Sequence, residues 1–249
     1  MTNYKDKIEE KYKKILFIHG WGFTNQVWVD FIENNIPMCN CICIDLYKYI
    51  DNSNGDLTVA AKKIVNEHDD IDLVVSWSLG CFLGKEIERL RNNRSFKMIY
   101  VSYNPKFKKT KDWKNGFNEN TINQLRIDLK NDIKKSFKNF YLLILGKYRT
   151  KKNLYKEIKK NLHPIMQINI TSLLNALDIL EKKDFLNCKF IGSKNLYIYG
   201  ENDEISPPII KEKIRYLGPD ASVVIIPNSS HIPFLTNKEC FLKIIKEFL

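Results

Sequence analysis

The sequence predicts an α/β fold in which a mostly parallel central sheet carries helices on both faces and a helical cap insertion. Short apolar runs of strand length alternate with segments whose apolar residues recur every three or four positions, as in βαβ units. This alternation stops after residue 103 and resumes near residue 196. The 249 residues, 44% of them hydrophobic, suffice to bury one full core.

The first part of the chain supplies alternating strands and helices. Apolar runs typical of strands cover residues 15–19, 39–46, 73–77 and 98–102. Helical spacing covers residues 26–34, 56–66 and 79–91. Asp56 is the expected N-cap of its helix, because a carboxylate there accepts the free backbone N–H groups of the first turn.

The second part of the chain returns to the same alternation after a long helical stretch. We expect strands at residues 196–200 and 223–227, and helices at residues 207–216 and 234–249. The simplest division is therefore a core made of residues 1–103 and 190–249, interrupted by a helical cap of residues 104–189.

A serine lies where one of these strands turns sharply into a helix. Its surroundings read Ser76-Trp77-Ser78-Leu79-Gly80. A strained strand-to-helix turn presents a serine hydroxyl to a base and to backbone N–H donors, which a serine nucleophile needs. The usual G-x-S-x-G has become S-x-S-x-G, and serine is small enough that we expect activity to survive. The alternative is that Ser78 is an ordinary helix N-cap.

Two further residues follow predicted strands and supply the partners of such a serine. Asp203 follows the strand at residues 196–200, and His231 follows the strand at residues 223–227. The order serine, acid, histidine is that of α/β-hydrolases. We predict Ser78 as nucleophile, His231 as general base and then acid, and Asp203 as the group that orients the imidazole.

A glycine-bracketed turn ends the first strand. It reads His19-Gly20-Trp21-Gly22, at the point where α/β-hydrolases form half of the oxyanion hole. We interpret His19 as structural, with its ring bonded to the backbone.

Several classes of protein and site are not expected. No stretch approaches the roughly 18 apolar residues of a membrane span. The charged N-terminus lacks the apolar segment of a secretory signal, so a cytoplasmic protein is expected. Cys39, Cys41 and Cys43 alternate along one predicted strand face without zinc spacing, and Cys81 is expected to pack the helix after Ser78 against the sheet. We predict no metal and no cofactor.

Basic residues concentrate in the insertion. Residues 104–163 hold 17 Lys or Arg and 5 Asp or Glu, whereas the whole chain has a net charge of +11. A basic surface implies an acidic partner, and the alternative is a general lysine bias in a Lys- and Asn-rich chain. Nucleic acid is not expected, because the sequence has no nucleic-acid-binding motif.

Taken together, these motifs resemble the pimeloyl-ACP methyl ester carboxylesterases, α/β-hydrolases of biotin synthesis. The resemblance runs over nearly the whole chain. It rests on His19-Gly20-Trp21-Gly22, Trp77-Ser78-Leu79-Gly80, the apolar segment beginning at Phe140, residues 174–180 and His231-Ile232-Pro233-Phe234.

The resemblance implies further site residues and a partner. The backbone N–H groups of Trp21 and Leu79 would form the oxyanion hole, and Trp21, Phe140 and Ile144 would contact the substrate. The partner would be an acyl carrier protein, an acidic helical bundle. The candidates for its docking site are the densest basic residues of the cap: Arg149, Lys151, Lys152, Lys156, Lys159 and Lys160.

The implied activity is hydrolysis of the methyl ester of pimeloyl-ACP to pimeloyl-ACP and methanol by a monomer. One alternative is a broader carboxylesterase or thioesterase acting on small free or CoA-linked acyl groups. Another is a catalytically idle scaffold that binds a ligand or a protein. The chain departs from the family after Asp45, where the usual Asp-x-Pro-Gly-x-Gly-x-Ser turn is absent. That loop borders the substrate entrance in the fold, so acyl preference is the property that this departure affects.

Overall fold

A computed structural model describes residues 14–36, 41–91, 97–188, 194–208 and 221–248. In this part of the chain six strands form one sheet in the order β2-β1-β3-β4-β5-β6, and all neighbouring strands are parallel. The strands are β1 (Ile15–Ile18), β2 (Cys41–Ile44), β3 (Leu73–Trp77), β4 (Lys97–Val101), β5 (Lys194–Gly200) and β6 (Ala221–Ile226). The predicted parallel sheet is confirmed.

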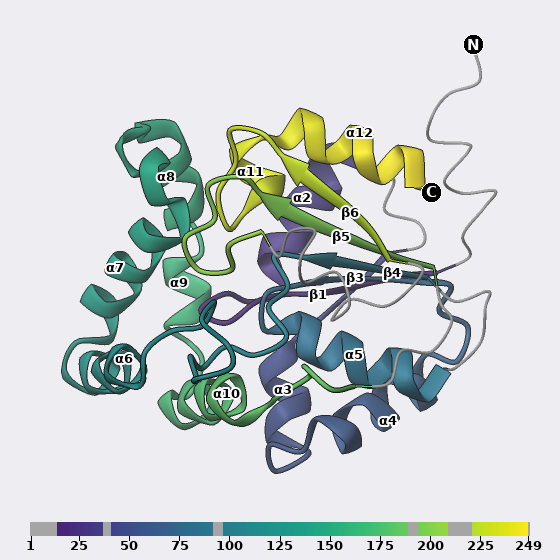
Figure 1. The fold of residues 1–249 in the computed structure, drawn as a ribbon, viewed down its shortest axis with the longest axis horizontal. Helices are drawn as coiled ribbons and strands as arrows, with labels where there is room; N and C mark the ends of the chain where they lie inside the picture. The colour runs from purple at the N-terminus through teal and green to yellow at the C-terminus, as the bar shows by residue number, and fades with distance from the viewer. Residues whose placement is uncertain (1–13, 37–40, 92–96, 189–193, 209–220, 249) are drawn as a thin grey trace.

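Helices cover both faces of the sheet (Figure 1). One face carries α2 (Gln26–Asn35), α11 (Pro233–Thr236) and α12 (Lys238–Phe248). The other carries α3 (Leu46–Asp51), α4 (Leu57–Glu67) and α5 (Gly80–Arg91). Strands β1 and β3 are buried along their whole length, as expected for strands with helices on either side.

The prediction of a strand at residues 39–46 is wrong at its C-terminal end, because it extends beyond the end of β2. Strand β2 ends at Ile44, and Leu46 begins helix α3. The reason is Asp45, whose carboxylate accepts the backbone N–H of Tyr47 and caps the helix. Cys39 lies outside the described residues, as does most of the helix expected at residues 207–216.

The prediction of a single helix at residues 234–249 is also wrong, because two helices, α11 and α12, meet at Asn237. Residue Asn237 follows α11, and its carboxamide oxygen accepts the backbone N–H of Cys240 in the first turn of α12. Its amide nitrogen donates to the carbonyl of Pro227. By contrast, Asp56 caps α4 as predicted, accepting the N–H groups of Thr58 and Val59.

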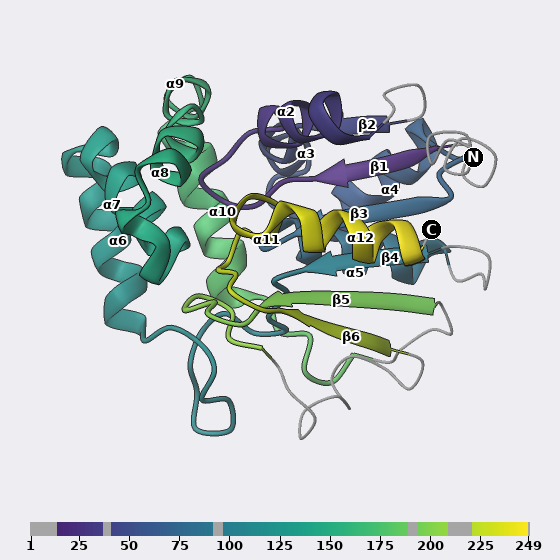
Figure 2. The ribbon, with the colours of Figure 1, turned by 90° about the horizontal axis from the view of Figure 1, so that it is seen from above.

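The residues between β4 and β5 form a group of helices beyond the carboxyl ends of the strands (Figure 2). They are α6 (Glu119–Asn131), α7 (Ile133–Leu145), the 3₁₀ helix η2 (Gly146–Thr150), α8 (Lys152–Lys159), α9 (Leu162–Ile165) and α10 (Ile170–Lys182). We call this group the cap. Parallel strands all point toward it, so residues at their carboxyl ends face the cap.

The cap is joined to the core by hydrogen bonds between buried groups. The indole N–H of Trp21 donates to the carbonyl of Leu173 on α10 at 3.0 Å. The Tyr141 hydroxyl on α7 donates to the carbonyl of Gly22 at 3.0 Å. Both contacts involve the turn after β1, so the position of the cap is tied to that turn.

Candidate active site

Ser78 occupies a strained turn between β3 and α5. Its φ is +54°, a left-handed conformation that non-glycine residues adopt at a cost. The turn is held by the Ser78 backbone N–H, which donates to the carbonyl of Val101 at 3.0 Å. Helix α5 then passes so close to β1 that a Cβ at Gly80 would lie 2.7 Å from the His19 carbonyl oxygen. Glycine at position 80 is therefore required by the turn.

The serine that replaces the usual first glycine of this motif is accommodated by a second glycine. Ser76 points toward α5, and a Cβ at Gly84 would lie 2.9 Å from its hydroxyl oxygen. The hydroxyl also reaches the carbonyl of Ile99 at 3.4 Å. Because Gly84 leaves this space, Ser76 fits without displacing the helix that follows Ser78.

The structure brings together Ser78, His231 and Asp203 from three separate strand ends. The Nε2 atom of His231 lies 2.9 Å from Oγ of Ser78. Its Nδ1 atom lies 2.8 Å from Oδ2 and 3.0 Å from Oδ1 of Asp203. With Nδ1–H bonded to the carboxylate, Nε2 is left to accept the serine proton, which is the arrangement of a Ser-His-Asp triad.

The acid and the base are both buried and both held by other groups. Asp203 Oδ1 accepts the backbone N–H groups of Ile205 and Ser206 at 2.9 and 2.8 Å. The carbonyl of His231 accepts the Trp77 indole N–H at 2.8 Å and the Ser102 hydroxyl at 3.0 Å. These bonds fix the imidazole between the carboxylate and Ser78 before any substrate binds.

The backbone N–H groups of Trp21 and Leu79 have no hydrogen-bond partner within the described part of the chain. Leu79 follows Ser78 directly, and Trp21 lies in the turn after β1. Two such donors are what an oxyanion hole requires, so the geometry is compatible with the expected role.

Helix α3 follows β2 at the point where the family's usual turn is absent, and it supports the turn that contains Trp21. The Tyr47 hydroxyl accepts the backbone N–H of Gly22 at 2.8 Å. His19 donates from Nδ1 to the carbonyl of Gly20 at 2.9 Å, and its Nε2 accepts the N–H of Leu46 at 3.0 Å. The structural interpretation of His19 is therefore confirmed.

Tyr47 and Ser102 were not found by sequence reasoning. Tyr47 acts through a contact with a turn 25 residues away. Ser102 follows β4 with a φ of +53°, and its hydroxyl contacts a residue 129 positions along the chain. Neither residue stands in a local motif, so only the parallel strand order would have drawn attention to Ser102.

Two of the three expected substrate-contacting residues meet at the turn after β1, because Trp21 lies in this turn and Phe140 packs against Trp21. The rings of Trp21 and Phe140 meet edge to face with centroids 4.8 Å apart. Phe140 also lines an apolar groove of about 440 Å³, within the usual range of small-molecule sites. Ile144 is buried within the cap and does not line this groove.

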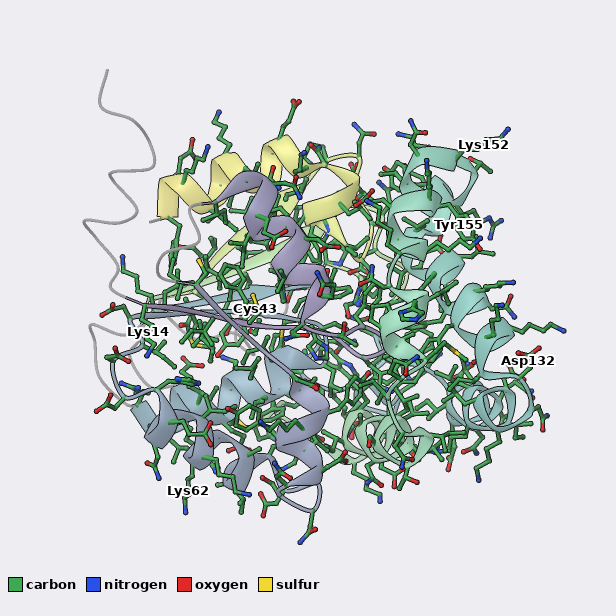
Figure 3. All side chains as sticks on the ribbon, turned by 180° about the vertical axis from the view of Figure 1, so that it is seen from behind. Lys14, Cys43, Lys62, Asp132, Lys152 and Tyr155 are labelled. Atoms are coloured by element: carbon green, nitrogen blue, oxygen red, sulfur yellow. The ribbon has the colours of Figure 1, made fainter. Side chains whose placement is uncertain are left out.

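Four of the expected docking residues, Arg149, Lys152, Lys156 and Lys159, lie on η2 and α8, and Lys151 and Lys160 flank α8 on either side. Figure 3 shows Lys152 at the outer edge of the cap, away from the sheet. Lys160 pairs with Glu157 at 2.8 Å. The ammonium of Lys151 lies 5.0 Å from the centre of the Tyr148 ring. Arg149, Lys152, Lys156 and Lys159 are exposed.

Cys81 packs α5 against the sheet, as expected. It is fully buried, and its Sγ lies 3.3 Å from the carbonyl oxygen of Ser76 and 3.4 Å from that of Val101. Burial raises the pKa of the Cys81 thiol to about 12. The thiol beside the nucleophile is therefore unreactive at neutral pH.

Neither a metal site nor a membrane span is found in the described residues. No three His, Cys, Asp or Glu side chains gather there in a way that could hold a metal ion. None of the described helices has the length and apolar character to cross a bilayer.

Comparison with known proteins shows similarity over nearly the whole chain. No family model matches. The chain is 29% identical over 243 residues to the pimeloyl-[acyl-carrier protein] methyl ester esterase of Wigglesworthia glossinidia brevipalpis, covering 94% of this chain and 93% of that protein. It is 26% identical to the enzyme of the same name from Legionella pneumophila (strain Corby), with full coverage of both. The resemblance drawn from the motifs is confirmed.

Solved structures identify the fold. A bromoperoxidase from Bacillus anthracis matches with a TM-score of 0.76 at 18% identity, covering 95% of this chain and 91% of that one. The esterase EaEST from Exiguobacterium antarcticum matches with a TM-score of 0.74 at 14% identity and the same coverage. The chain has the α/β-hydrolase fold, as predicted.

Proposed function

We propose that this chain is a serine carboxylesterase that hydrolyses the methyl ester of pimeloyl-ACP to pimeloyl-ACP and methanol. The observation that carries the proposal is the hydrogen-bonded series from Ser78 through His231 to Asp203. The substrate is taken from the curated relatives, which are named for this ester and match along nearly the whole chain.

In the first half of the reaction, Oγ of Ser78 attacks the carbonyl carbon of the methyl ester. Its proton passes to Nε2 of His231, and Asp203 stabilises the imidazolium that forms. The backbone N–H groups of Trp21 and Leu79 bind the oxyanion of the tetrahedral intermediate. When this intermediate collapses, the C–O bond to the methoxy group breaks, and His231 returns the proton to the departing methanol.

The second half of the reaction repeats these steps with water. His231 takes a proton from a water molecule, whose oxygen attacks the acyl carbon bound to Ser78. Collapse of the second intermediate breaks the bond to Oγ, and the proton from His231 restores the serine hydroxyl. The product carries a free carboxylate in place of the methyl ester.

An acyl carrier protein is the partner that this function requires. The exposed cations of η2 and α8 give the cap a positive surface suited to an acidic protein. Glu157 is the only acidic residue between positions 147 and 160, so carboxylates of this segment itself neutralise little of that charge. We place the docking surface on Arg149, Lys151, Lys152, Lys156, Lys159 and Lys160.

The test is methanol release from pimeloyl-ACP methyl ester by the purified protein. The native chain is expected to release methanol, and Ser78→Ala, which loses one oxygen atom and keeps the fold, is expected to release none above background. A native protein that cleaves p-nitrophenyl acetate but not pimeloyl-ACP methyl ester would overturn the proposed substrate and keep the esterase chemistry.

A further inference from the structure

The turn after β1 is held by side chains on both sides of Trp21, whose backbone N–H is one of the two expected oxyanion donors. This N–H belongs to the same planar peptide group as the Gly20 carbonyl, which accepts Nδ1–H of His19 at 2.9 Å. The next peptide group contains the N–H of Gly22, which donates to the Tyr47 hydroxyl at 2.8 Å. Both peptide groups that meet at the Cα of Trp21 are therefore fixed by a hydrogen bond to a side chain.

A second tyrosine holds the carbonyl side of Gly22. The Tyr141 hydroxyl donates to the Gly22 carbonyl at 3.0 Å. Tyr47 lies on α3 in the core, whereas Tyr141 lies on α7 in the cap (Figure 1). Burial raises the pKa of both hydroxyls above the ordinary value of a tyrosine, so both stay protonated at neutral pH. One residue of the turn is thus bonded at its N–H by the core and at its carbonyl by the cap.

The cap also fixes the side chain of Trp21 and packs against the backbone of the turn. The indole N–H of Trp21 donates to the carbonyl of Leu173 on α10. Gly22 has a φ of +76°, and a Cβ at this position would lie 2.6 Å from a ring carbon of Phe140. With the indole held in this way, the direction of the Trp21 backbone N–H depends on the hydrogen bonds of the two peptide groups beside it.

Tyr47 stands at a position where the chain departs from its family. In the Asp-x-Pro-Gly-x-Gly-x-Ser pattern that would begin at Asp45, this position is a proline, which has no hydroxyl to accept an N–H. Gly22 is buried, so its N–H without the Tyr47 hydroxyl would lack a partner, at a cost in free energy. Rotation of the turn toward another acceptor would also turn the N–H of Trp21.

We propose that Tyr47 and Tyr141 are positioning residues of the oxyanion hole, whose hydroxyls hold Gly22 so that the N–H of Trp21 points at the oxyanion formed on Ser78. This inference rests on the serine chemistry of the proposed function and does not depend on the carrier-linked substrate. An oxyanion donor acts mainly on the tetrahedral intermediate, so a change in its direction lowers turnover more than it weakens binding of the ester.

The test compares three variants that each lose one tyrosine hydroxyl. In Tyr47→Phe, kcat for p-nitrophenyl acetate is expected to fall about tenfold with little change in KM, because acylation and deacylation both pass through an oxyanion. In Tyr141→Phe the fall is expected to be about threefold, since Tyr141 holds a peptide group one step further from Trp21. The control is Tyr49→Phe on the same helix, α3, where the lost hydroxyl bonds to Glu67 and not to the turn. Its kcat is expected to stay at the native value.

A trifluoromethyl ketone supplies a readout that a loss of stability alone would not move. Oγ of Ser78 adds to the ketone carbon, its proton passes to His231, and the ketone oxygen becomes an oxyanion in the same hole. The inhibition constant is expected to rise by the same factor as kcat falls in each tyrosine variant. Both quantities are measured per active site, counted by titration with a fluorophosphonate.

The outcomes separate this inference from the proposed function. An unchanged kcat in Tyr47→Phe, an equal loss in Tyr49→Phe, or a fall in kcat with a native inhibition constant would overturn it. If Tyr47→Phe does not fold, the same two measurements on Tyr141→Phe decide. A native chain that cleaves p-nitrophenyl acetate but not pimeloyl-ACP methyl ester, together with the expected losses in the variants, would overturn the proposed substrate alone and support the role of the two tyrosines.

Discussion

The core and the cap differ in how far their charged groups are exposed to water. In the core, Lys85 and Glu88 are both buried, and the ammonium lies 2.9 Å from the carboxylate and 2.7 Å from the Tyr197 hydroxyl. Glu88 also accepts bonds from Tyr100 and Asn195. On the cap, the cations of η2 and α8 are exposed. Buried charges are fixed by the fold, whereas exposed charges are available to a partner.

Burial also distinguishes two ion pairs whose nitrogen–oxygen distances are similar. Arg126 on α6 lies 2.7 Å from Asp178 and 2.6 Å from Glu181 on α10, and these groups are partly exposed to water. Solvent screens such pairs, while the pair in the core is shielded from it. The contribution of each ion pair to stability therefore depends on its burial as well as on its distance.

The largest effect is expected when the buried acid of the active site loses its charge. Asp203→Asn is expected to reduce turnover of p-nitrophenyl acetate about 10⁴-fold, because the amide favours the wrong tautomer of His231. Labelling of Ser78 by a fluorophosphonate, followed by mass spectrometry of the peptide, is expected to slow in parallel. Turnover within tenfold of the native value would remove Asp203 from the triad.

Next in size is the loss of the buried ion pair. Lys85→Met leaves Glu88 buried without its cation and is expected to lower the free energy of unfolding by about 3–5 kcal/mol. Arg126→Met, the matched change in the cap, is expected to cost about 1 kcal/mol or less. Urea denaturation of both variants measures the difference. Equal costs would show that burial does not distinguish the two contacts.

A smaller effect is expected from reversing the exposed charges of the cap. Replacing Arg149, Lys152 and Lys156 by Glu is expected to raise KM for pimeloyl-ACP methyl ester severalfold and to flatten its salt dependence, since salt screens exposed charges. A short p-nitrophenyl ester carries no acidic protein and is expected to react as before. Equal losses on both substrates would indicate damage to the cap, and no loss on either would remove the proposed docking surface.

The smallest effect is expected at the thiol next to the nucleophile. Because burial raises the pKa of Cys81 to about 12, almost none of it is thiolate at pH 8. Iodoacetamide at that pH is expected to leave Cys81 unmodified in the native protein and to alkylate it in urea. Rapid alkylation of the native protein, located by peptide mapping, would mean that α5 opens far more readily than its packing indicates.

The sequence alone determined the fold class and the candidate triad. Strands were recognisable from continuous apolar runs, because parallel strands buried on both faces show no alternation. Ser78, Asp203 and His231 each follow such a run, and the carboxyl ends of parallel strands meet at one edge of the sheet. Local pattern and topology together were therefore enough to place these three residues near one another.

Only the tertiary structure decided which side chains surround the carboxyl ends of the strands. The hydrogen bond from Gly22 to Tyr47 and the space that Gly84 leaves for Ser76 both depend on elements distant in sequence or on the details of packing. Side-chain contacts of this kind depend on the whole arrangement of helices and leave no periodic signal in the chain. The strand ends follow from the pattern of residues, whereas the way in which the cap closes over them follows from how its helices pack.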